Sequence, residues 1–192
     1  MTPMDRAIEL IDQANMADPT LESDGANEKP KAYLYGLRMS GWLDRLAPDA
    51  SDALRIAARA QHIERWTVPR NTYPLGRTGY NAWRTGLHKF HAERAGEIMA
   101  GLGFDAKTIQ QTGELLQKKH LKRNPETPML EDVICLVFLE NEFDGFAAKH
   151  EEEKIIDILQ KTWAKMSDTG HQAALGLDFT PEAKRLVEKA LS

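Results

Sequence analysis

The sequence has little cysteine and lacks the patterns of several common enzyme classes. Cys135 is the only cysteine among the 192 residues, so a disulfide within the chain is excluded. A single thiol inside the apolar run 133–138 is typical of a small buried hydrophobe in a reducing compartment. There is no Gly-rich phosphate loop, no paired CxxC, no HExxH and no nucleophile elbow. These absences exclude most nucleotide kinases, zinc proteases and α/β-hydrolases.

Long apolar runs are also missing. None approaches the roughly 20 residues that a membrane-spanning helix needs, and the first residues lack the basic flank and apolar stretch of a signal peptide. We therefore expect a cytoplasmic protein with no membrane partner. The net charge of -4 argues against bulk binding of nucleic acid, although it leaves room for a local basic pocket.

Along most of the sequence, apolar residues recur at the spacing expected of helices. With 42% apolar and 28% charged residues, the chain is expected to form one globular domain over residues 1–192. Alternating strand patterns are essentially absent, so we predict an all-α, multi-helix bundle. The predicted loops are 18–30 and 67–79, and Thr180-Pro181-Glu182 starts the last helix within a C-terminal helical segment, 176–192. The other predicted helices are 4–17, 31–46, 51–66, 80–102, 105–119, 130–146 and 151–166.

The segment 65–84 concentrates cationic and aromatic side chains around a loop that joins two predicted helices. Guanidinium groups bind phosphate or carboxylate, aromatic faces stack on rings, and prolines restrict the loop. These residue types predict a site that binds an anionic, nucleotide-like small molecule. The alternative is a loop pinned to the surface by aromatic packing and arginine–acid pairs. The predicted ligand-binding residues are Arg65, Trp66, Arg70, Tyr73, Arg77, Tyr80 and Arg84, with Lys119 as a further cation.

Histidines and one carboxylate supply candidate chemistry. His62 lies in a helix of small apolar residues, His88 and His91 share a helix face, and Glu140 follows an apolar run where burial is expected. We predict that His62, His91 and Glu140 converge as catalytic groups, with a divalent metal ion as a candidate cofactor that they would bind. One alternative is that His62 is a core histidine whose hydrogen bonds are satisfied. For the acids at 131–132, the alternative is that they only place negative charge at a helix N-terminus.

Longer strings of the chain resemble an uncharacterised family, catalogued as domain of unknown function 4202. Some of its members carry the label glutamyl-tRNA synthetase, but no motif here supports that label. The resemblance covers nearly the whole chain and implies a shared fold without a known activity. It is carried by 58–66, by Pro69-Arg70, Tyr73-Pro74, Arg77, Gly79-Tyr80 and Trp83-Arg84, and by 90–92, 130–133, 135–140 and 161–167.

The helix order is similar to that of the HD superfamily, which contains helical metal-dependent phosphohydrolases. The resemblance places His62 and His91 near metal-binding histidines of that superfamily, His120 near a further one, and Glu140 at a metal aspartate. Two positions depart from the pattern. Ile63 stands where the paired aspartate should be, and Tyr35 stands about where the first histidine should be. These departures imply an altered metal site, or a cleft that binds an anion without hydrolysing it.

Three functions follow from these patterns. The first is an HD-like, metal-dependent phosphohydrolase that acts on an anionic small molecule. The second is a regulatory module that binds such a metabolite without chemistry. The third is a helical module whose aromatic loop binds another protein. The sequence leaves open whether the chain forms homo-oligomers.

Overall fold

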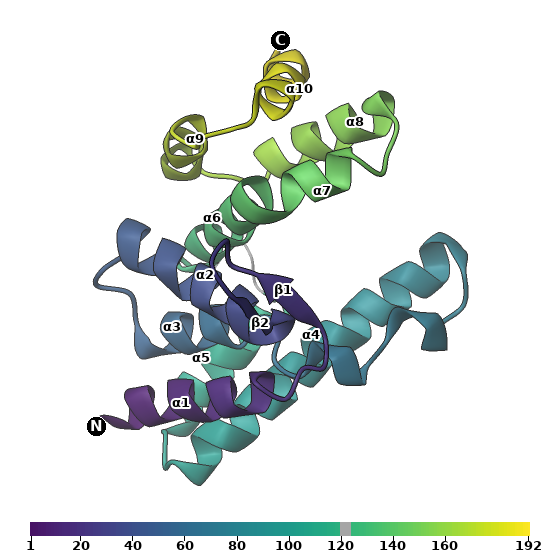
Figure 1. Cartoon of the computed structure of the whole chain (residues 1–192). Coiled ribbons are helices and arrows are strands. Elements are labelled where there is room, and N and C mark those ends of the chain that lie inside the picture. Colours follow the sequence, from purple (N-terminus) through teal and green to yellow (C-terminus); the bar gives the residue numbers. More distant parts are fainter. Residues whose placement is uncertain (120–123) are drawn as a thin grey trace. The chain divides into compact units, whose positions relative to one another are not determined.

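The computed structural model describes residues 1–119 and 124–192. By its contacts the chain divides into two compact units, Met1–Glu126 and Thr127–Ser192, and each is described by itself. Figure 1 shows that the elements are mainly helices, so the predicted helical class is confirmed. The predicted single domain over residues 1–192 stays a prediction.

Unit 1 contains five α-helices in its described part: α1 (Pro3–Asn15), α2 (Lys31–Leu46), α3 (Asp52–Arg59), α4 (Gly76–Gly101) and α5 (Ala106–Leu116). Helix α3 packs against α1, α2 and α5. Its Ile56, Ala57 and Ala58 are completely buried, because small apolar side chains let three helices approach closely. Helix α3 therefore lies in the middle of the helices of unit 1.

The predicted loop 18–30 is partly wrong, because it contains a two-stranded hairpin, β1 (Leu21–Ser23) and β2 (Glu28–Pro30). The strands are antiparallel, with Glu22 opposite Lys29. Asp24 closes the turn by accepting from the backbone N–H groups of Ala26 and Asn27. Strands of three residues are too short to show the alternation by which a strand is recognised in sequence.

Two predicted boundaries around the aromatic loop are also wrong. The third helix ends at Arg59 rather than at Trp66, and α4 begins at Gly76 rather than at Tyr80. Between them lie two short 3₁₀ turns, η1 (Arg65–Thr67) and η2 (Arg70–Thr72). The predicted loop 67–79 is thus a structured connector that runs directly into a long helix.

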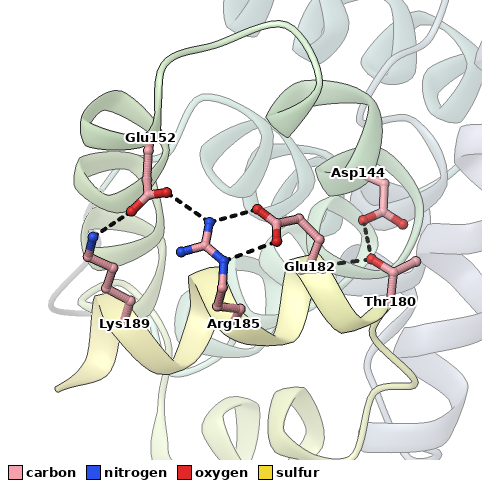
Figure 2. Close-up of polar contacts among 7 residues, drawn as sticks. Asp144, Glu152, Thr180, Glu182, Arg185 and Lys189 are labelled. Carbon is pink, nitrogen blue, oxygen red and sulfur yellow. Dashed lines mark hydrogen bonds and ion pairs between the residues drawn. The ribbon is translucent and has the colours of Figure 1, made fainter.

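Unit 2 contains α6 (Thr127–Val137), α7 (Phe143–Ala147), α8 (Glu152–Trp163), α9 (Asp168–Leu175) and α10 (Pro181–Leu191). A π-helical turn, η3 (Phe138–Glu142), joins α6 to α7. Cys135 is buried, as predicted. Helix α10 packs on α8, and Figure 2 shows Arg185 joining Glu152 to Glu182, while Thr180 contacts Asp144.

Helix α9 was not predicted, because it lies between the predicted helix 151–166 and the predicted C-terminal segment 176–192. Asp132, completely buried, accepts from the backbone N–H of Ser167 at 2.7 Å and also from its hydroxyl. The Ser167 hydroxyl in turn accepts from the N–H of Gly170. Asp132 therefore supports the start of a helix 35 residues away, rather than only charging the start of its own.

Candidate functional site

The N-terminal half of α4 and the connector before it form one structure, which we call the arm (residues 65–86). Figure 1 shows the arm extending past the other helices of unit 1. The indole N–H of Trp83 donates to the carbonyl of Val68 at 2.8 Å. A Cβ on Gly79 would lie 1.9 Å from the carbonyl oxygen of Pro74, so the connector runs in direct backbone contact with α4. The arm is therefore held in shape by contacts of its own.

Arg70 belongs to the framework of the arm. Its guanidinium donates to the carbonyls of Tyr73 at 3.0 Å and Pro74 at 2.9 Å. These bonds satisfy backbone carbonyls that would otherwise accept hydrogen bonds from water, because the connector has no regular helix or strand there. We therefore assign Arg70 to holding the connector, although the sequence predicted it as a ligand-binding residue.

The other predicted ligand-binding residues lie along the arm at different depths. Arg77, Tyr80 and Arg84 are exposed on α4, and the Arg84 guanidinium lies 5.8 Å from the centre of the Tyr80 ring. Trp66 and Tyr73 are half-buried. All five of these predicted residues therefore lie on the arm. Their role in binding a ligand stays a prediction.

Two histidines meet at the base of the arm, in what we call the histidine cluster (Tyr35, His62, Arg65 and His91). His62 stacks on Tyr35 with ring centres 3.7 Å apart, and the rings of His62 and His91 are 6.2 Å apart. The Arg65 guanidinium lies over the Trp83 ring at 4.7 Å. The structure therefore brings together three residues that the sequence selected, all of them in unit 1.

A strained residue sets the position of Arg65. Glu64 adopts a left-handed backbone conformation, with φ of 49°, which is unfavourable for a residue with a side chain. Its N–H donates to the side chain of Asn15 at 3.0 Å, and its carboxylate pairs with Arg94. These partners come from α1 and α4, so the turn after His62 is fixed by side chains distant in sequence.

His91 has a polar atom without a hydrogen-bond partner. The residue is 1% exposed, and its Nε2 makes no hydrogen bond in the structure. A buried polar atom in this state is uncommon in folded proteins and points to a ligand, a water or a functional role. Because His62 and Arg65 adjoin it, the histidine cluster is the strongest candidate site in unit 1.

Burial and positive charge keep both imidazoles neutral. Burial lowers the pKa of His91 to about 3, with further lowering by the charges of Arg65 and His88. Burial likewise holds the pKa of His62 well below its usual range, and Arg65, His91, Lys31 and His88 lower it further. The charges that act on these rings are all positive, so an anion in contact with them would relieve repulsion.

This depressed pKa predicts a loss of stability in acid. Below about pH 6.5 a histidine in the unfolded chain takes up a proton, whereas His91 in the folded protein does so only near pH 3. The free energy of unfolding should therefore fall between these values, by up to about 1.4 kcal/mol per pH unit for each such histidine. Urea denaturation of wild-type protein and His91→Gln at pH 7.5, 6 and 5 should show a shallower decline in the variant. Equal declines would contradict the assignment.

The remaining predicted residues lie elsewhere. Glu140 is exposed in η3 of unit 2, where it accepts from the side chain of Asn141, so the expected burial is wrong. Lys119 is exposed and lines a groove of about 440 Å³ between α4 and α5, with Lys89, Glu93 and Glu114. His120 lies outside the described residues. Across 1–119 and 124–192 no group of three or more His, Cys, Asp or Glu side chains is placed to hold a metal ion.

Sequence reasoning missed one member of the cluster and two residues that act on it. Tyr35 was noted only as a departure from the HD pattern, and Lys31 and Asn15 were not selected at all. Asn15 lies inside a predicted helix and Lys31 begins one, so neither carries a signal of its own. Tyr35 could have been found as an aromatic residue at a core position of its helix, where a polar hydroxyl needs a partner.

The fold and cluster define a mainly helical protein with a buried, electropositive histidine site. The chain belongs to the family described as Domain of unknown function (DUF4202), whose model matches residues 5–187. No curated protein and no solved structure matches the chain. No helix among the described residues is long and apolar enough to cross a membrane.

Proposed function

We propose that unit 1 binds the phosphate group, or a similar anion, of a small molecule at the histidine cluster. The unpartnered Nε2 of buried His91, whose ring centre lies 6.2 Å from that of His62, is the observation that carries this proposal. An imidazole N–H that donates to an anionic oxygen satisfies such an atom. Arg65 supplies a guanidinium whose charge acts on both rings.

The pKa values of the histidines support the binding of an anionic ligand rather than of a positively charged one. Neutral imidazoles carry no charge, and the positive charge of Arg65 acts on both rings. A bound anion would raise the pKa of His62 and His91, so binding should be coupled to proton uptake. The affinity should then increase as the pH falls, because the protonated rings bind the anion more tightly.

The finer prediction is that a metal ion of the HD type hydrolyses the bound molecule. This prediction requires that the histidines also bind a metal ion. Neutral imidazoles are the form that binds divalent metal ions, and His62 and His91 are both neutral. Metal analysis of wild-type protein, His62→Ala and His91→Ala tests this part. A stoichiometric ion lost in both variants would favour hydrolysis, and anion binding without an ion would favour the regulatory alternative.

The binding proposal is tested by titrating the protein with phosphate and with sulfate, which does not titrate between pH 5.5 and 7.5. We expect thermal stabilisation and a calorimetric binding signal for both anions in wild-type protein, stronger at pH 5.5 than at pH 7.5. Arg65→Ala should weaken binding at least tenfold, because a charge-assisted hydrogen bond contributes about 1.5–3 kcal/mol. Lys154→Ala removes an exposed positive charge from unit 2 and serves as the matched control.

The controls also fix what would defeat the proposal. Circular dichroism must show that Arg65→Ala is folded. Equal binding by Arg65→Ala and Lys154→Ala would place the anion elsewhere. Binding of sulfate with no change between the two pH values would disconnect it from the histidines.

A further inference from the structure

One stretch of the chain has a charge unlike the rest. The 28 residues from Arg65 to Ala92 contain five arginines and lysines and no aspartate or glutamate. The rest of the chain has 20 basic and 29 acidic residues. A protein with net negative charge thus carries a basic, acid-free element, and much of that element is the arm.

The exposed face of the arm alternates guanidinium groups with an aromatic ring. Arg77 and Arg84 are seven residues apart, about two helical turns and roughly 10 Å along the axis, so they share one face of α4. Tyr80 lies between them on this face and is 44% exposed. In the described part of the chain neither arginine pairs with an acid. This trio forms what we call the arm stripe (Arg77, Tyr80 and Arg84).

The stripe continues the face by which α4 packs on its own unit. His91 lies a further seven residues along, and it is buried together with Leu87, Ala95 and Met99. The same face is therefore core-forming in the second half of the helix and exposed in the first half.

We propose that the arm stripe binds single-stranded nucleic acid. Arginines at fixed spacing contact successive backbone phosphates, and an exposed ring between them stacks an unpaired base. Bases inside a duplex are not open to such stacking, which favours single strands. Trp83 and Gly79 fix the connector along the neighbouring side of α4. This inference does not depend on the histidine cluster.

A second copy of the chain is the main alternative occupant. The most acidic run in the sequence is Glu151-Glu152-Glu153. Glu152 already pairs with Arg185 at 2.8 Å and also with Lys189, as Figure 2 shows. The centre of that run is therefore neutralised within its own unit, which makes it a poor partner for the arm.

Fluorescence anisotropy with a labelled 12-nucleotide RNA of mixed sequence, and with the same RNA in a duplex, tests the proposal. We expect the single strand to bind more tightly than the duplex. Arg77→Ala combined with Arg84→Ala should weaken binding at least tenfold and reduce the slope of log affinity against log salt by about 1.4, because two phosphate contacts are lost. Tyr80→Ala should cost about tenfold, and Tyr80→Phe should bind like wild type because the ring remains.

Matched controls separate this proposal from the others. Lys154→Ala combined with Lys184→Ala removes two exposed charges from unit 2 and should leave RNA binding unchanged. The arm double variant should keep its response to sulfate, and Arg65→Ala should lose that response, so the two sites can fail independently. RNA binding that is absent, or equally weakened by both double variants, would overturn the proposal. So would equal, stripe-dependent binding of a polyglutamate peptide, or stripe-dependent self-association in sedimentation.

Discussion

Asp12→Ala should destabilise unit 1 by about 3 kcal/mol, the lower end of the cost of removing one partner from a buried ion pair, because Arg59 is buried and Asp12 is half-buried. Arg59 is 6% exposed, and its Nε and one terminal nitrogen each donate to the Asp12 carboxylate at 2.6 Å. Its remaining donor contacts the carbonyl of Gly36 and the hydroxyl of Ser40, both at 3.2 Å. Without Asp12, the guanidinium would stay buried with its charge uncompensated. Urea denaturation, followed by circular dichroism, measures the change.

Two further variants make this result specific. Asp157→Ala breaks the exposed pair with Lys161 and should change stability by no more than about 0.5 kcal/mol. Asp12→Ala combined with Arg59→Met should recover part of the loss, because the buried charge is then absent. A cost for Asp12→Ala no greater than that for Asp157→Ala would show that the α1–α3 pair does not hold the unit together.

Gly79→Ala should detach the connector from α4. The new Cβ would lie 1.9 Å from the carbonyl oxygen of Pro74 and 2.6 Å from its carbonyl carbon, and backbone cannot move aside as a flexible side chain can. We expect a loss of about 3 kcal/mol, at the upper end for overpacking. Hydrogen exchange should show faster exchange in the connector, and sulfate binding should weaken because Arg65 loses its fixed position.

Gly41→Ala is the matched control for this prediction. Gly41 lies within α2, is exposed, and has no atom within 4 Å of its Cβ position. Alanine there should stabilise the protein by up to about 1 kcal/mol, because glycine is a poor helix former. If Gly79→Ala and Gly41→Ala change stability and connector exchange alike, the close approach of Pro74 to α4 is not a feature of the protein in solution.

Helix starts could be predicted from the sequence wherever the signal is local. Ser51, Asp105 and Thr180 each accept from a backbone N–H in the first turn of the helix that follows. Such caps depend on side chains two or three residues from their partners, so a single sequence reveals them.

Elements fixed by distant partners could not be predicted. Helix α9 depends on Asp132, and the turn after His62 depends on Asn15, which accepts from the Glu64 N–H 49 residues away. The candidate site divides in the same way. His62 and His91 were selected as polar residues on apolar helix faces, whereas the engagement of Arg70 with its own connector required coordinates.

The most direct test of an anion site at the histidine cluster is the pKa of the His91 ring, measured by nuclear magnetic resonance with and without sulfate. In the free protein we expect a value far below 6.5, because burial and Arg65 disfavour the imidazolium. Saturating sulfate should raise it above about 5.5 in wild-type protein, the rise that stronger binding at pH 5.5 than at pH 7.5 requires, and leave it nearly unchanged in Arg65→Ala. An ordinary pKa in the free protein, or one that sulfate does not move, would contradict the account.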